Sequence, residues 1–201
     1  TMEVNVADNV LLQCKGKQNA PPIQKYMPML QQFLTQQKFE LKEHASHCGL
    51  IQDANGQYYS VNNLPDNLTI NDFLNLSDCT GMTQLPKNLS VEGGFDLTGC
   101  TGLTQLGENL SVGDNLYLRG CSNLTQLSEN LSVRGKLDLQ NCTSLTQLAE
   151  NPVVGGNIDL SSCHELEKLP ENLSVNGYLS LRSCYALAQL PENLSTKGYL
   201  D

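Results

Sequence analysis

The sequence predicts a solenoid of the α/β-repeat class, in which short coils of chain stack along one axis. A leucine opens each of six complete copies of a 21-residue segment and a seventh, partial copy, without any insertion. Six cysteines recur at the same interval, and a fixed period near 20 residues is typical of solenoid repeats. The leucines that open the copies are Leu64, Leu85, Leu106, Leu127, Leu148, Leu169 and Leu190.

Each copy follows the consensus LPxNLSVxGxLxLxxCxxLTQ. The segment xLxLxx alternates apolar and polar residues, which is the period of a β-strand, and stacking predicts a parallel sheet on a concave face. LSV is a second extended piece on the convex side, and a glycine with positive φ is expected in the turn between the two. Stacking also buries the leucines in columns, and each buried side chain stabilises the stack by roughly 1.5–3 kcal/mol.

The cysteines share one repeat position, so stacking predicts a column of thiols about 4.8 Å apart with parallel side chains. This geometry disfavours disulfides, and free thiols fit a reducing compartment. The opening TMEVNVADNV has neither a basic start nor an apolar core, so no secretory signal is expected. We therefore expect the protein to act in a reducing cytoplasm. The column comprises Cys79, Cys100, Cys121, Cys142, Cys163 and Cys184.

An asparagine occurs in the fourth position of every copy, from Asn67 to Asn193. A side-chain amide both donates and accepts, so this column is expected to bridge neighbouring coils. N-glycosylation at Asn-Leu-Ser/Thr is the alternative, but it requires a secreted protein, which the thiols and the missing signal oppose.

The motif LxLxxCxxLTQLPxNL resembles a leucine-rich repeat with cysteine where many repeats have asparagine. MTQLPKNL (82–89) and LEKLPENL (166–173) are similar to the LP-type repeats of effectors that bacterial pathogens deliver into host cells. The resemblance covers residues 64–201, although C-x-x-L replaces N-x-L and lengthens the repeat to 21 residues. It implies a leucine-rich-repeat solenoid and a virulence protein that reaches the host cell by a signal-peptide-independent route. Several such effectors carry a ubiquitin-ligase Cys-x-Asp motif, which this sequence lacks.

Charge and hydropathy exclude some classes of partner. The net charge is −9, with 7 basic and 16 acidic residues in 64–201 and 5 of each in 1–63. An acidic array repels phosphate, so we expect no nucleic-acid binding. No apolar run approaches the roughly 18 residues that span a bilayer, so no membrane association is expected.

Residues 1–63 are predicted to form an N-terminal cap on the repeats of 64–201. We expect a helix over 21–48 with an apolar stripe, a hairpin over about 50–61 around Asn55-Gly56, and an extended pair in residues 3–15. The stripe comprises Tyr26, Met29, Leu30, Phe33 and Leu34.

The cap also offers an alternative function, as a small enzymatic or metal-binding domain. His44, His47 and Cys48 could share a metal, but a structural zinc site needs a fourth ligand, for which only Cys14 is available. A Cys–His nucleophile pair would need a third group to orient its base. The sequence therefore favours a protein without metal, cofactor or catalytic residues.

The variable positions of the predicted concave strands are the candidate partner-binding site. Tyrosine and arginine dominate interface hot spots, and aspartates there could pair with basic residues of a partner. Packing between neighbouring strands is the alternative explanation. The candidates are Phe73, Asn75, Asp96, Tyr117, Arg119, Lys136, Asp138, Asp159, Tyr178, Arg182 and Tyr199.

These observations predict a non-enzymatic protein-binding module that is a monomer by itself. The effector resemblance implies that it engages or inhibits a host protein or another effector. A further hypothesis is that the chain is the recognition part of a longer effector enzyme whose working domain follows Asp201.

Overall fold

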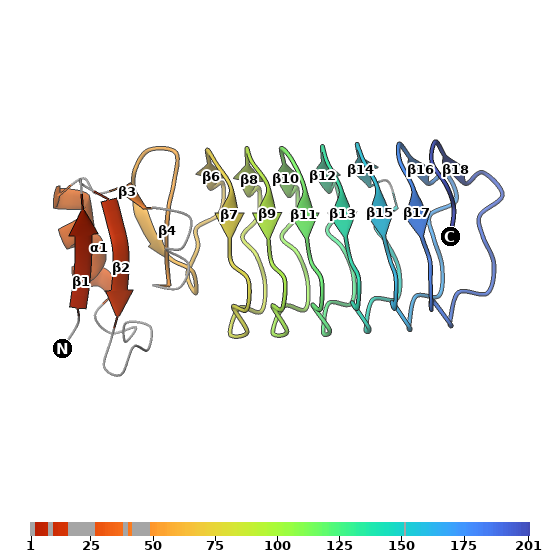
Figure 1. The fold of residues 1–201 in the computed structure, drawn as a ribbon, viewed down its shortest axis with the longest axis horizontal. Coiled ribbons are helices and arrows are strands. Elements are labelled where there is room, and N and C mark those ends of the chain that lie inside the picture. The colour runs from red at the N-terminus through yellow and green to blue at the C-terminus, as the bar shows by residue number, and fades with distance from the viewer. Residues whose placement is uncertain (1–2, 8–9, 16–26, 38–39, 42–48, 151) are drawn as a thin grey trace.

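The computed structural model describes residues 3–7, 10–15, 27–37, 40–41, 49–150 and 152–201. The stacked coils form a solenoid, with the helix and three short strands beside its N-terminal end (Figure 1). No helix in the described part of the chain has the length and apolar character needed to cross a bilayer.

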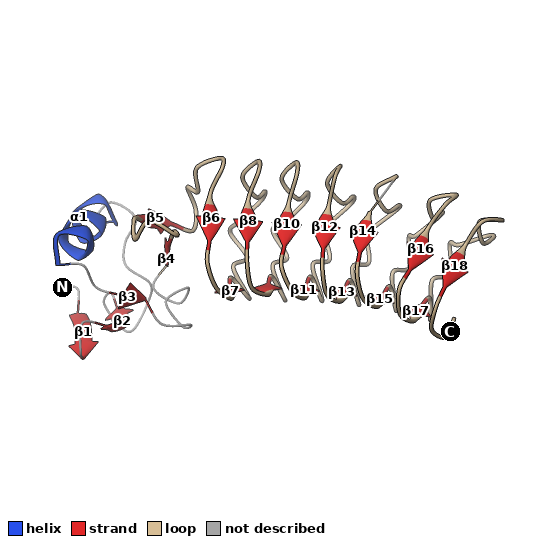
Figure 2. Ribbon diagram, turned by 90° about the horizontal axis from the view of Figure 1, so that it is seen from above, coloured by secondary structure: helices blue, strands red, loops and turns tan. Residues whose placement is uncertain are grey.

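Two parallel sheets run along the solenoid, as Figure 2 shows from above. The first is five-stranded and comes from the LSV segments, and the second is six-stranded and comes from the xLxL segments. The five-stranded sheet contains β6 (Thr69–Ile70), β8 (Ser90–Val91), β10 (Ser111–Val112), β12 (Ser132–Val133) and β14 (Val153–Val154). The six-stranded sheet contains β7 (Leu74–Asn75), β9 (Phe95–Asp96), β11 (Leu116–Tyr117), β13 (Leu137–Asp138), β15 (Ile158–Asp159) and β17 (Leu179–Ser180).

The pairing register equals the sequence period. Leu116 pairs with Phe95 on one side and with Leu137 on the other. In all the remaining pairs of repeat strands, each residue likewise pairs with the residue 21 positions away. A third edge of the coil carries isolated parallel bridges that link Gln84, Gln105, Gln126 and Gln147. The first sheet is interrupted after β14, in the copy where Pro152 replaces a leucine, and β16 (Ser174–Val175) pairs with β18 (Ser195–Thr196).

The apolar columns form one continuous core between the two sheets, as the repeat predicts. The side chains at the second strand leucine are fully buried from Leu76 to Leu160, and the valines that face them from the other sheet are also buried. Four cysteines are fully buried among them, and all six repeat cysteines are free. Each thiol from Cys100 to Cys184 donates a hydrogen bond to the carbonyl of a leucine in the preceding coil, at 3.0–3.2 Å.

The asparagine column bridges the coils, as the sequence predicts. Asn109 Nδ2 donates to Asn88 Oδ1 at 2.7 Å, and Asn130 Nδ2 donates to Asn109 Oδ1 at 3.0 Å. The members of the column that the structure describes are exposed, and the first four have φ between 55° and 62°. Asparagine tolerates this left-handed conformation better than most residues do.

The expected positive φ at the turn glycines is wrong. Positive φ falls instead on the asparagines and on the residue before each cysteine, such as Gly99 and Asn141. The turn glycines are needed for space, because a Cβ on Gly93 would lie 2.7 Å from the Phe73 backbone nitrogen of the preceding coil.

The hairpin prediction is confirmed by β4 (Leu50–Gln52) and β5 (Tyr58–Ser60), which pair antiparallel. The hairpin lies against the first coil, because Ile51 and Val61 belong to the solenoid core and Ala54 N donates to Thr69 O at 2.8 Å. The extended pair is also confirmed, as β1 (Glu3–Ala7) pairs antiparallel with β2 (Val10–Lys15).

The helix predicted over 21–48 is wrong in extent. Helix α1 covers Met27–Gln37, and Glu40–Leu41 form strand β3, which pairs parallel with β2. Strand pairing therefore overrides the helical pattern at these residues, while 21–26, 38–39 and 42–48 lie outside the described residues.

The buried stripe of the helix also differs from the prediction. It consists of Met27, Leu30 and Leu34, which fall on one side of a helix with about 3.6 residues per turn. Met29 is 69% exposed and Phe33 is 45% exposed because both lie on the other side of the helix, and Tyr26 lies outside the described residues. The stripe packs towards the hairpin, where Gln31 Nε2 donates to Tyr58 O at 3.3 Å.

Candidate functional site

The outward face of the six-stranded sheet gathers the predicted binding residues. Strand alternation turns Leu74, Leu76 and their equivalents inward, so the residues before, between and after them point outward. Three outward columns result, which we call the first, middle and third columns. The predicted residues fall in the first column (Phe73, Lys136, Tyr178, Tyr199), the middle column (Asn75, Asp96, Tyr117, Asp138, Asp159) and the third column (Arg119, Arg182).

The middle column has a structural role that the sequence analysis missed. In four coils an aspartate or asparagine accepts a hydrogen bond at Oδ1 from the backbone amide two residues later, which is an Asx-type cap. Asn75 binds Ser77 N at 2.9 Å, and Asp96 binds Thr98 N at 2.8 Å. Asp138 Oδ1 accepts from Gln140 N at 3.2 Å. Asp159 Oδ1 accepts from Ser161 N at 3.1 Å. The signal in the sequence was an aspartate or asparagine at the end of a strand, followed two residues later by a polar residue.

Two coils depart from this cap. Ser180 instead shares a hydrogen bond of 2.9 Å with Ser161 Oγ in the neighbouring coil. Tyr117 places a phenol in the middle column, and its hydroxyl accepts a hydrogen bond of 3.2 Å from Asn115 Nδ2. Tyr117 therefore occupies a position where four other coils place a capping side chain.

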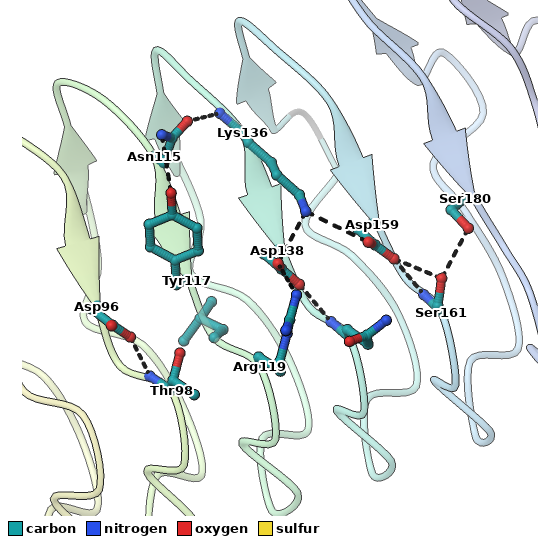
Figure 3. A network of polar contacts seen from close by, with 12 residues as sticks. Asp96, Thr98, Asn115, Tyr117, Arg119, Lys136, Asp138, Asp159, Ser161 and Ser180 are labelled. Atoms are coloured by element: carbon teal, nitrogen blue, oxygen red, sulfur yellow. Dashed lines mark hydrogen bonds and ion pairs between the residues drawn. The ribbon is translucent and has the colours of Figure 1, made fainter.

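A charged cluster lies next to Tyr117, at the centre of the sheet (Figure 3). Arg119 Nη2 and Lys136 Nζ each lie 3.0 Å from Asp138 Oδ2, and Lys136 Nζ also lies 3.5 Å from Asp159 Oδ2. The cluster joins three adjacent strands and places two cations over two carboxylates.

These contacts favour the charged forms of Asp159 and Lys136. Partial burial alone would raise the pKa of Asp159, but hydrogen bonds from Ser161 and the charge of Lys136 lower it below its usual value. Partial burial would lower the pKa of Lys136, but the hydrogen bond and charge of Asp138 outweigh it and raise that pKa. Both groups therefore stay charged near neutral pH.

The C-terminal part of the same face contains an open hollow of about 410 Å³. The rings of Tyr178 and Tyr199 stack there with centroids 5.0 Å apart, and Arg182 pairs with Asp201 at 2.6 Å. Asp159 and Ser161 line the hollow as well, so it is continuous with the charged cluster. Phe73 stands apart at the N-terminal end of the sheet, with its ring over Gly94.

A larger open groove, of about 640 Å³, lies elsewhere on the solenoid. It is lined by the glutamine edge and by residues such as Leu85, Lys87 and Glu108. None of the predicted binding residues lines it. We therefore place the candidate site on the six-stranded sheet, where the variable side chains are, and not in this larger groove.

The alternative metal or catalytic site cannot be built from the described residues. His44, His47 and Cys48 lie outside them. Within the part of the chain that the structure describes, no three His, Cys, Asp or Glu side chains are grouped to hold a metal. The cap hypothesis therefore stays a hypothesis.

Comparison of the chain with protein-family models, with curated proteins and with solved structures finds no match.

Proposed function

We propose that the protein is a non-enzymatic binding module that presents the outward face of the six-stranded sheet to a partner protein. The observation that carries this proposal is the contrast between the two sides of one sheet. Its inward side chains repeat from coil to coil, whereas its outward ones differ at the same register. Tyr117 departs from the local capping rule, and such departures are expected where a residue serves function.

The backbone of the face is rigid before any partner binds. Leu116 N, Leu118 N and their equivalents donate to carbonyls of the next coil at 2.6–3.1 Å along the whole sheet. A preordered surface loses little conformational entropy on association, so more of its contact energy contributes to affinity. Tyr117, Arg119 and Tyr178 are of the residue types that dominate interface hot spots.

The kind of partner follows from the resemblance of the repeats to LP-type effector repeats. On that basis the partner is a host protein or a fellow effector, met inside a reducing compartment where the free thiols of the core persist. A rigid face of this kind suits inhibition of an enzyme by covering its active-site cleft.

The experiment compares three forms of the full chain as bait for host-cell and bacterial proteins. They are the wild type, the double variant Tyr117→Ser/Arg119→Gln, and the control Arg134→Gln, which removes a positive charge from an exposed turn outside the face. Captured proteins are identified by mass spectrometry, purified and titrated calorimetrically. We expect the double variant to lose about 2–4 kcal/mol of binding free energy, and the control to bind like the wild type. Unchanged affinity of the double variant would contradict the proposal.

A further inference from the structure

We infer that the centre of the six-stranded sheet, around Arg119 and Lys136, receives an acidic side chain of the partner protein. This inference rests on the proposed function and adds the chemistry of the contact. The sequence alone suggested the reverse, with aspartates of the sheet pairing with basic residues of a partner.

In the charged cluster the two cationic side chains are more exposed than the two carboxylates. The side chain of Asp138 is only 1% exposed and that of Asp159 13%, whereas Arg119 is 51% exposed and Lys136 23%. The carboxylates therefore lie beneath the cations. A molecule that approaches the sheet here meets the cations first, although the four charges sum to zero.

Arg119 retains capacity for a second carboxylate. Its guanidinium has five N–H donors in a planar fork, and its contact with Asp138 is made through Nη2. Asp138 also fixes the position of the fork, so little side-chain freedom is lost when another carboxylate binds. Arginine forks suit the geometry of carboxylates.

Tyr117 adds a neutral donor beside these cations. Its hydroxyl oxygen accepts from Asn115, which leaves its own hydrogen for an acceptor on the partner. Asp96 lies on the other side of Tyr117, in the adjacent strand, and its Oδ1 binds the Thr98 amide. The phenol therefore separates Asp96 from the exposed cations.

The acidic charge of the rest of the array restricts where an acidic group of the partner can bind. Residues 64–201 hold 7 basic and 16 acidic residues, so most of the array repels a carboxylate. An acidic group of the partner is then favoured where Arg119 is exposed and disfavoured beside Asp96, the carboxylate in the next strand towards the N-terminal end. Such local complementarity fixes the register of a complex more than it raises affinity.

The test is a selection from a displayed library of a single-domain scaffold whose binding loops contain only Tyr, Ser, Asp and Arg in equal amounts. The full wild-type chain is the target, and binders are sorted by their loss of affinity for Tyr117→Ser. We expect the sorted binders to be enriched in Asp over Arg and to bind Arg119→Gln at least tenfold more weakly. Arg134→Gln, with the same loss of charge in an exposed turn, should leave their affinity unchanged.

The outcomes separate this inference from the proposed function. Binders that depend on Tyr117 but are rich in Arg, or that ignore Arg119→Gln, overturn the acidic partner and leave the binding face intact. A selection in which no binder responds to Tyr117→Ser overturns both. Circular dichroism of each variant confirms that it keeps the wild-type fold.

Discussion

The thiol of Cys142 donates a hydrogen bond of 3.1 Å to the backbone carbonyl of Leu118 in the preceding coil. The same contact recurs along the column from Cys100 to Cys184 and ties each of these coils to the one before it, through a group that is fully buried in every coil but the last of them. Burial raises the pKa of Cys142 far above its ordinary value, with smaller contributions from the neighbouring thiols.

The buried thiols should therefore be inert in the native protein. Burial is the main cause that raises the pKa of Cys100, Cys121 and Cys163 to about 12, so almost no reactive thiolate exists at pH 8. We expect iodoacetamide to modify these three cysteines only after unfolding in urea, as followed by peptide mass spectrometry. Labelling of Cys121 in the native protein at the rate of a free thiol would contradict the buried column.

Gly107→Ala should destabilise the solenoid by about 1–3 kcal/mol, because a Cβ at this position would overlap the Pro86 carbonyl of the preceding coil. Gly81→Ala is the matched control, since a Cβ there meets nothing within 4 Å. We expect it to change the free energy of unfolding by less than about 0.5 kcal/mol. Denaturant titration measures both, and equal losses would show that the coils are not in close contact at Gly107.

Asn109→Ala should lower the free energy of unfolding by about 1–3 kcal/mol. Alanine is strained in the left-handed backbone conformation of this residue, and it cannot make the hydrogen bond to Asn88. Asn109→Gly loses the same bridge but accepts a φ of 58° without strain. The glycine variant should therefore be the more stable of the two in thermal unfolding. The reverse order would refute the role of backbone conformation in this column.

Asp159→Asn should flatten the loss of stability in acid. The pKa of Asp159 is lowered in the folded state from an ordinary value of 3.8, so its carboxylate stabilises the fold fully above that value. The contribution is lost as pH falls from about 4 through the lowered pKa. Asparagine keeps the cap, as Asn75 does naturally, but does not titrate. Urea midpoints from pH 6 to pH 2 should converge for variant and wild type, and a constant gap would contradict the assignment.

Tyr117→Asn should separate stability from binding. Asparagine restores the cap that Asn75 provides in the first coil, so we expect a melting temperature equal to or above that of the wild type. Loss of the phenol should weaken binding of the partner at the same time. A clearly lower melting temperature with full binding would mean that Tyr117 is structural.

The sequence predicts the solenoid well because one strict period specifies register, strands and core together. Each inward leucine is repeated, so its neighbours in space are known once the coils stack. The cap was predicted less well, because Glu40 and Leu41 pair with β2 through contacts that no local pattern reveals.

The candidate face was only partly predictable for a similar reason. Tyr117 and Arg119 were found as variable residues, but Asp138 looked equally available for a partner. Its burial depends on Arg119, which reaches over it from the preceding coil, and on Lys136, which lies two residues before it in the same coil. Such contacts arise from side-chain reach across coils, which a one-dimensional repeat does not encode.

The strict match between sequence period and strand register has an evolutionary consequence. A duplicated copy inserted among the regular coils from β6 to β13 would find complementary donors and acceptors on both sides, because these neighbours pair in the same register. The length of the molecule can therefore change by whole units without redesign of its interior, while each new unit brings outward side chains that are free to diversify.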